Sequence, residues 1–97
     1  MDKPELDAIR LSPLDGVATV LRAIARGDRL RIGGGDRIVE VEAIDDIPLC
    51  HKIALVPHKA GDRILKYGEP IGEATQAIRP GGHVHVHNLR SLRARAK

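Results

Sequence analysis

Five alternating residues near the end of the sequence place three imidazoles where they could act together. His83, His85 and His87 are separated by single valines, Val84 and Val86. Alternate side chains of an extended strand point to opposite faces, so this pattern predicts three histidines on one face and two buried valines on the other. Neutral imidazole is a common ligand for zinc, iron, copper and nickel, and its charge changes near neutral pH. The pattern therefore predicts either a metal site or an acid–base site.

The spacing along a strand limits the metal hypothesis. Alternate residues on one face lie roughly 6 to 7 Å apart, at a rise of about 3.3 Å per residue. Two adjacent histidines can reach one ion, whereas three require a bend, and a further carboxylate or histidine must come from elsewhere in the chain. The alternative is that the histidines are only the polar face of an amphipathic strand.

A second pair of candidate residues precedes an apolar segment. His51 and Lys52 are followed by Ile53-Ala54-Leu55. Partial burial would lower the pKa of either group toward neutrality and make it a candidate catalytic base; an exposed pair is the alternative. Cys50 is expected to be a small buried thiol and not a nucleophile activated by His51, because neighbouring residues of a strand face opposite ways.

Tyr67 and Asp15 are candidate substrate-binding residues. Tyr67 is the single aromatic residue of the sequence, and its hydroxyl could orient a ligand, although packing is the commoner use of tyrosine. Asp15 lies in a predicted turn over residues 12–16, where a carboxylate can reach a cation or a substrate hydroxyl. The Asp45-Asp46 pair lies in a similar segment. Turns use aspartate just as often, so the structural alternative stays open.

Composition limits the class of protein. The chain has 97 residues and 42% hydrophobic content, with no Phe and no Trp, so one small domain with an aliphatic core is expected. Lys and Arg exceed Asp and Glu by 16 to 13. Nucleic acid is nevertheless not an expected partner, because single-strand binders stack bases on aromatic rings. One cysteine excludes an internal disulfide, and no apolar run is long enough for a signal peptide or membrane span, so a cytoplasmic location is predicted.

The rest of the sequence predicts short strands separated by turns. Apolar, β-branched segments over residues 8–11, 17–21 and 38–43 are bounded by Pro, Gly or Asp, although a short helix is the alternative near Arg26. Gly33-Gly34-Gly35-Asp36 predicts a hairpin loop and not a phosphate loop, since neither a lysine nor a helical pattern follows it. These features predict a compact all-β domain.

A weak internal repeat relates residues 23–32, 56–65 and 77–86. Each unit is a turn, a glycine able to take positive φ, and then a strand. In the third unit, histidines take the positions that arginines hold in the first. We expect a flexible N-terminus over residues 1–7, the domain over 8–89, and a basic C-terminal tail over 90–97.

Several spaced motifs, taken in order, resemble one family. They are Asp15-Gly16-Val17-Ala18, Asp46-Ile47-Pro48-Leu49-Cys50-His51-Lys52-Ile53-Ala54-Leu55, Lys66-Tyr67-Gly68, Ile71-Gly72 and His83-Val84-His85-Val86-His87-Asn88. The set resembles the SAF-type domain that begins the altronate and galactarate dehydratase family, and also the small subunit of sulfolactate sulfo-lyase. The resemblance implies a β-clip fold. It also implies a larger catalytic chain that eliminates water or sulfite from a hydroxylated carboxylate, generally with a divalent metal such as iron or manganese.

Our leading hypothesis is therefore a small SAF-domain subunit of a metal-dependent lyase that acts on a sugar acid or other small hydroxy acid. Elimination next to a carboxylate needs a base for the α-proton, an electrophile for the enediolate and an acid for the leaving group. We predict catalytic roles for His51 and Lys52, substrate binding by Asp15 and Tyr67, and metal ligation by His83, His85 and His87.

Three residues depart from the family pattern, which commonly has histidine at Ser12, asparagine at Gly16 and glycine at Cys50. The change at Cys50 matters only if the backbone there needs positive φ. One alternative hypothesis is a non-catalytic module that binds a carboxylate ligand or a protein through the histidine face. Another is a structural homodimer or higher oligomer that pairs exposed strand edges.

Overall fold

Nine short strands carry the fold in the part of the chain that the computed structural model describes, residues 5–34 and 37–91. The strands are β1 (Ala8–Ile9), β2 (Val17–Val20), β3 (Arg29–Gly33), β4 (Val39–Glu42), β5 (Lys52–Ala54), β6 (Arg63–Lys66), β7 (Glu69–Ala74), β8 (His83–Val84) and β9 (Leu89–Ser91). No helix occurs among these residues, so the predicted all-β class is confirmed, and the short helix kept as an alternative near Arg26 does not form. None of the described segments is a helix able to cross a membrane.

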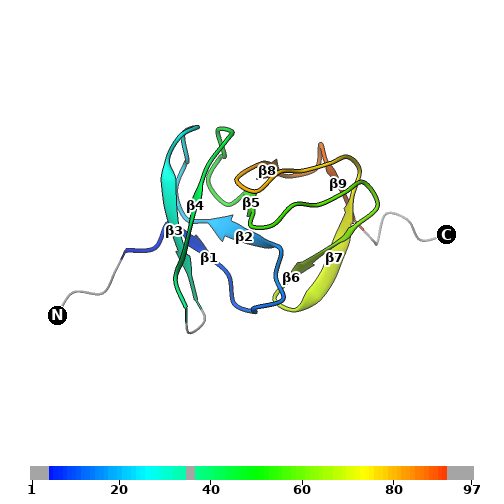
Figure 1. Cartoon of the computed structure of the whole chain (residues 1–97), viewed down its shortest axis with the longest axis horizontal. Helices are drawn as coiled ribbons and strands as arrows, with labels where there is room; N and C mark the ends of the chain where they lie inside the picture. The colour runs from blue at the N-terminus through cyan, green and yellow to red at the C-terminus, as the bar shows by residue number, and fades with distance from the viewer. Residues whose placement is uncertain (1–4, 35–36, 92–97) are drawn as a thin grey trace.

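The strands form two sheets. The larger sheet has the order β4-β3-β1-β2-β5-β8, and the smaller has the order β6-β7-β9. All neighbouring pairs are antiparallel except β1 and β3. Figure 1 shows the β3–β4 and β6–β7 hairpins at opposite ends of the molecule, with β2 and β5 between them.

Two hydrophobic cores lie on either side of the central strands β2 and β5. Ala18 and Ile53 belong to the first core, whereas Val17 and Ala54 belong to the second. Successive side chains of a strand face opposite ways, so each central strand is buried on both faces. This double burial explains why the sequence of β2 is almost continuously apolar.

The predicted repeat is present, and it has a fourth copy that the sequence did not reveal. In each copy the third residue of a turn has positive φ: 94° at Gly27, 73° at Cys50, 91° at Gly61 and 87° at Gly81. A hydrogen bond from the fourth turn residue to the first closes every turn, which is the pattern of a type II turn. The copy around Cys50 was not predicted from the sequence, because it lacks the glycine that marks the other three.

The four copies form two matching halves of the chain. Ile24 bridges Ile47 in the first half, and His58 bridges Ile78 in the second. Each half contains one turn before a hairpin, the hairpin itself, and a second turn that leads into β5 in the first half and β8 in the second. The turns before the hairpins are called the outer turns below (residues 25–28 and 59–62), and those before β5 and β8 are called the inner turns (residues 48–51 and 79–82).

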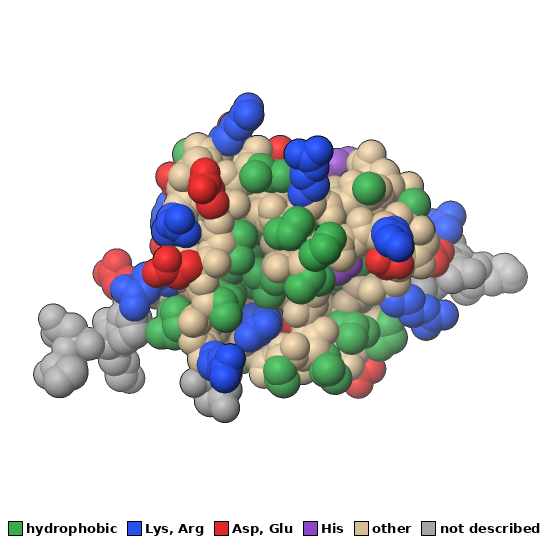
Figure 2. All heavy atoms as spheres, viewed as in Figure 1, with side chains coloured by type: hydrophobic (Ala, Val, Ile, Leu, Met, Phe, Trp, Pro, Cys, Tyr) green, Lys and Arg blue, Asp and Glu red, His purple; other side chains and the backbone are tan. Residues whose placement is uncertain are grey.

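Large hydrophobic side chains remain on the surface of the described chain. Figure 2 shows hydrophobic side chains gathered over the middle of one face. The exposed large hydrophobic residues are Leu11, Leu14, Leu21, Ile38, Ile44, Leu49, Val56, Tyr67 and Val86. Single exposed apolar residues are normal, but contiguous patches mark surfaces that other molecules cover.

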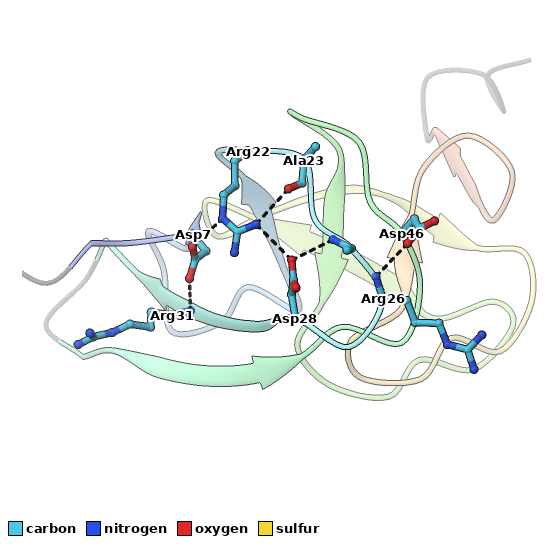
Figure 3. A network of polar contacts seen from close by, with 8 residues as sticks. Asp7, Arg22, Ala23, Arg26, Asp28, Arg31 and Asp46 are labelled. Carbon is cyan, nitrogen blue, oxygen red and sulfur yellow. Dashed lines mark hydrogen bonds and ion pairs between the residues drawn. The ribbon is translucent and has the colours of Figure 1, made fainter.

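A polar network ties the N-terminal segment to the first half (Figure 3). Arg22 Nε donates to Asp7 Oδ1 at 3.0 Å, and Arg22 Nη1 donates to Asp28 Oδ2 at 3.2 Å. Asp7 Oδ2 accepts a hydrogen bond from the backbone N–H of Arg31. Exposed ion pairs each contribute only about 0–1 kcal/mol, so the network fixes the position of the segment more than it stabilises the fold.

Parts of the predicted termini lie outside the described residues, namely 1–4 of the flexible N-terminus and 92–97 of the basic tail. Arg90, with which the predicted tail begins, lies in β9 and forms an ion pair with Glu73 at 2.6 Å. Residues 35–36 of the predicted glycine loop are also outside the description, while β3 and β4 on either side form the predicted hairpin.

Candidate functional site

The predicted histidine strand ends after two residues. Strand β8 contains only His83 and Val84, and the following residues 85–88 form a bend and a turn. Val84 is buried in the second core, but Val86 is 81% exposed. The prediction that both valines are buried was therefore wrong.

Asn88 causes the departure from a strand. Its side chain is buried, Oδ1 accepts a hydrogen bond from His85 N–H at 3.0 Å, and Nδ2 donates to the His83 carbonyl at 2.8 Å. The Asn88 N–H also donates to the His85 carbonyl. These bonds replace ladder hydrogen bonds with a local turn, as asparagine side chains often do. Asn88 thereby fixes the backbone that carries the histidines.

Four imidazoles nevertheless gather in one place, here called the histidine cluster: His51, His83, His85 and His87. His51 Nδ1 lies 2.8 Å from His83 Nε2. The rings of His51 and His85 stack with centroids 3.6 Å apart, and His87 lies against His83 at 4.8 Å. The pairing of β5 with β8, in which Ile53 is opposite His83, brings these segments together.

The bond between His51 and His83 gives the cluster one basic and one acidic end. One of the two facing nitrogens must donate and the other accept, and the structure leaves the tautomers open. If His51 donates from Nδ1, its Nε2 carries a free lone pair while His83 keeps a proton on Nδ1. The opposite tautomers reverse the two ends. Either arrangement can accept a proton at one ring and deliver one from the other.

Desolvation and mutual repulsion favour the neutral form of two imidazoles of the cluster, His83 and His85. Desolvation lowers the pKa of His83, and His87, His51 and His85 lower it further, against a small opposing effect of Asp45. Desolvation also lowers the pKa of His85, followed by repulsion from His51, Lys52 and His87. Neutral imidazoles are the form that accepts protons or binds metals.

Lys52 adds a partly buried cation beside the cluster. Burial lowers its pKa, and the Lys66 ammonium lowers it further. Thr19 pairs with Lys52 across β2 and β5, and its buried hydroxyl has no hydrogen-bond partner among the described residues. Lys66 Nζ lies 4.9 Å from the centroid of the Tyr67 ring, and this tyrosine is half exposed. The cationic surface thus extends from the cluster toward Tyr67.

Asp15 holds a turn. Its buried carboxylate accepts hydrogen bonds from Tyr67 N–H at 2.8 Å and Gly68 N–H at 2.7 Å, and a longer one from Ser12 N–H at 3.3 Å. Tyr67 and Gly68 both have positive φ, so the carboxylate stabilises a tight turn between β6 and β7. These contacts match the structural alternative for Asp15, and its role in substrate binding stays a prediction, as does that of Tyr67.

Cys50 is exposed, which contradicts the predicted buried thiol. It occupies the third position of an inner turn with a φ of 73°, where a side chain points outward and glycine is the favoured residue. The glycine that the resemblance predicts at this position would therefore have a conformational reason. His51, the next residue, turns into the cluster.

Gly16 and His58 are in close contact, so the size of each side chain limits the size of the other. A Cβ at position 16 would lie 2.7 Å from His58 Cε1, and His58 Nε2 lies 3.2 Å from the Gly16 carbonyl oxygen. His58 fills the space that a larger side chain at position 16 would need. His58 stands out against the repeat, since isoleucines (Ile24, Ile47 and Ile78) hold the other three bridge positions.

The described residues do not form a complete metal site. No group of three or more His, Cys, Asp or Glu side chains within them is arranged to hold a metal ion. Lone pairs of imidazole lie in the ring plane, so stacked rings such as His51 and His85 direct their nitrogens side by side and not at one point. Metal ligation by His83, His85 and His87 stays a prediction, and it would require further ligands.

A hollow of about 300 Å³ adjoins the cluster. It is lined by Ile44, Asp45, Gln76, Ala77, Ile78, Arg79, Gly82, His83, His87 and Asn88. Sequence reasoning missed Gln76 and Arg79. Gln76 lies shortly before an inner turn and Arg79 is the first residue of that turn, and no sequence motif marks either position. The hollow places polar and charged groups next to two of the four imidazoles.

Comparison with known proteins agrees with this architecture. The sequence model of the altronate/galactarate dehydratase SAF domain matches residues 6–92. Altronate dehydratase of Bacillus subtilis (strain 168) is 46% identical over 83 residues, which cover 86% of this chain and 16% of that protein. The Escherichia coli (strain K12) altronate dehydratase is 36% identical over the same shares of both chains.

A shorter relative is the (2R)-sulfolactate sulfo-lyase subunit alpha of Paracoccus pantotrophus. It is 50% identical over 48 residues, which cover 50% of this chain and 72% of that subunit. The chain thus spans about a sixth of the length of the altronate dehydratases and matches most of the sulfo-lyase subunit. The match to the SAF-domain model extends over nearly the whole sequence, and the chain belongs to the altronate/galactarate dehydratase SAF domain family.

Proposed function

We propose that this chain is the small SAF-domain part of a lyase that removes water, or another leaving group, from a sugar acid or related hydroxy acid together with a larger catalytic chain. The observation that carries the proposal is the cluster of four imidazoles beside the half-buried Lys52. The relatives supply the reaction class, since two are altronate dehydratases and one is a sulfo-lyase subunit alpha.

The cluster has the groups that such an elimination requires. A neutral imidazole with a free lone pair accepts the α-proton of the acid, and the C–H electron pair passes into the developing enediolate. The Lys52 ammonium stabilises that anion, because a partly desolvated cation interacts more strongly than an exposed one. The electron pair then expels the hydroxyl, and the protonated end of the His51–His83 pair supplies the proton that turns it into water.

A divalent metal such as iron or manganese belongs to the proposal only through the larger chain. The described residues lack a closed ligand set, so no step is assigned to a metal here. Such an ion in the complete enzyme would draw most of its ligands from the partner.

The need for a larger chain is supported by length and by surface. Altronate dehydratases extend far beyond the matched region, and the described chain exposes many large hydrophobic side chains (Figure 2). A partner that covers this surface would remove apolar area from water. A homodimer or higher oligomer through the edge strands β4 and β8, and the cytoplasmic location, stay predictions.

Reconstitution tests the proposal. The chain is mixed with any larger lyase chain that proves to be encoded next to it, and elimination from altronate, galactarate and sulfolactate is assayed with each chain alone and with both. We expect turnover only with both chains, and a decrease of 10²-fold or more when His51→Gln removes the proton relay. Arg63→Gln, on the exposed side of β6, is the matched control. Full turnover by the larger chain alone would refute the proposal.

A non-catalytic carboxylate-binding module is the second candidate function. It is favoured by the cationic surface of Lys52 and Lys66 together with the absence of a closed metal site among the described residues. In that case the acid binds the chain with no metal present, and His51→Gln leaves the turnover of the mixture unchanged.

A further inference from the structure

The hollow beside the histidine cluster has the composition of a site for a small anion. His83 and His87 belong both to its lining and to the cluster, whereas His51 and Lys52 do not line it. A molecule in the hollow would therefore meet the cluster from the side of His83 and His87. Its volume of about 300 Å³ is at the small end of ligand sites, which favours a compact molecule over a nucleotide or a cofactor.

Arg79 is a charged group of the hollow that has no ion-pair partner among the described residues. It is exposed and forms no ion pair with any acid in residues 5–34 and 37–91, whereas Arg22, Arg29 and Arg90 each do. Its planar guanidinium can bind both oxygens of a carboxylate. An arginine that lines a hollow and lacks an ion pair is therefore available to an anionic ligand.

The remaining polar groups select for hydroxyls. Asp45 lines the hollow, and its Oδ2 accepts a hydrogen bond from His83 N–H at 3.0 Å. The other carboxylate oxygen forms no hydrogen bond or ion pair within residues 5–34 and 37–91, and it can accept from a ligand hydroxyl. The side-chain amide of Gln76 can donate and accept. A carboxylate oxygen near the ligand repels an anion that has no donor to offer it, and it favours an acid whose hydroxyl can donate a hydrogen bond.

We propose that this hollow binds one carboxylate of a short hydroxy acid through Arg79, with Asp45 accepting from a hydroxyl. Arg79 is then a specificity-determining residue that holds the acid against His83 and His87. Identification of that acid as a substrate rests on the proposed function, whereas its binding to the hollow does not.

Direct titration tests the binding. Tartrate, a dihydroxy diacid, is added to the full 97-residue chain, and NMR follows the Hε1 signals of the histidines and the Nε–H signal of each arginine. We expect saturating shifts at His83, His87 and Arg79, with tartrate binding more tightly than succinate, which lacks hydroxyls, or threitol, which lacks carboxylates. Because hydrogen bonds to charged groups are worth about 1.5–3 kcal/mol, Arg79→Gln should weaken binding by about 10- to 100-fold.

Controls separate the site from general charge. Arg79→Lys keeps the charge and should lose less affinity than Arg79→Gln, and Arg63→Gln should bind tartrate as the unchanged chain does. A dispersed amide spectrum shows that each variant is folded. Equal binding of tartrate and threitol, or unchanged affinity in Arg79→Gln, would overturn the inference, as would inorganic phosphate binding more tightly than tartrate.

The reconstituted mixture distinguishes this inference from the proposed function. If the mixture eliminates water, Arg79→Gln should raise KM about 10-fold or more with a smaller change in kcat. Turnover with an unchanged KM in Arg79→Gln would refute the role of Arg79 and leave the proposed function intact. Arg79-dependent binding of tartrate without any turnover would support the hollow as a site and refute the lyase.

Discussion

The outer and inner turns of this chain share one backbone conformation but differ in the residue that follows the positive-φ position. In the outer turns this residue is Asp28 or Asp62, and its carboxylate accepts a hydrogen bond from the first N–H of its own turn at 3.0 or 2.8 Å. In the inner turns it is His51 or Gly82, and neither can stabilise its turn in this way. Each outer turn is thus stabilised by a side chain of its own.

The inner turns depend on contacts between the two halves. His51 of the first half bonds His83 of the second, and His83 N–H donates to Asp45 of the first. The pairing of β5 with β8 brings the two turns together. The comparison teaches that one duplicated turn can serve as a structural device at the ends of the molecule and as a carrier of reactive side chains where its copies meet.

The largest expected effect contrasts one glycine from each kind of turn. A Cβ at Gly81, in an inner turn, would collide with the Glu42 carbonyl oxygen, whereas a Cβ at Gly27, in an outer turn, would meet open space. Gly81→Ala should therefore lower the free energy of unfolding by about 3 kcal/mol or more, and Gly27→Ala by about 1–2 kcal/mol from positive φ alone. Urea unfolding measures both, and equal losses would contradict the contrast.

A second test measures the coupling between Gly16 and His58, the bridge residue at which the second half differs from the first. Gly16→Asn places a side chain against His58 Cε1 and should cost about 2–3 kcal/mol by overpacking. In a His58→Ala background the same substitution should cost at least about 1 kcal/mol less, because the ring is gone. A double-mutant cycle from unfolding curves gives this coupling, and additivity within about 0.5 kcal/mol would show that the two residues do not exclude each other.

The third test compares how the stability contributed by the two kinds of turn depends on pH. The folded state lowers the pKa of His83 and of His85, so the unfolded chain binds more protons as the pH falls. Their contribution to stability should be complete above about pH 6.5 and decrease as the pH drops through the lowered values. The Asp28 carboxylate of an outer turn also has a lowered pKa, mainly from its hydrogen bond with Ala25, but its contribution is lost only below about pH 4.

Substitutions show which residues cause the loss of stability in each of the two pH ranges. The double variant His83→Gln/His85→Gln should flatten the dependence of the urea midpoint on pH between 5 and 7 and leave the fall below pH 4 unchanged. A midpoint that varies with pH in the variant as it does in the unchanged chain would mean that other groups cause the dependence.

Local patterns predicted the fold, and side-chain contacts decided the site. The all-β class and three of the four repeat copies followed from glycines at turns and short apolar segments, which act within a few residues. The bend at His85 was not predictable from alternation, because it depends on how the side chain of Asn88 folds back. The turn contacts of Asp15 lie 52 and 53 residues away, so its sequence neighbours gave no signal of them.

The smallest expected effect concerns the one turn without glycine. Cys50 holds a φ of 73° without the freedom of glycine, so Cys50→Gly relieves strain but increases the entropy of the unfolded chain. Since positive φ costs a non-glycine residue about 1–2 kcal/mol and glycine loses about 0.5–1 kcal/mol in entropy, a net gain of about 0.5–1 kcal/mol is expected. Cys50→Ala, which removes the exposed thiol but keeps a Cβ, should leave the urea midpoint nearly unchanged. If alanine stabilised the chain as much as glycine, the thiol and not the backbone would distinguish this turn from the other three.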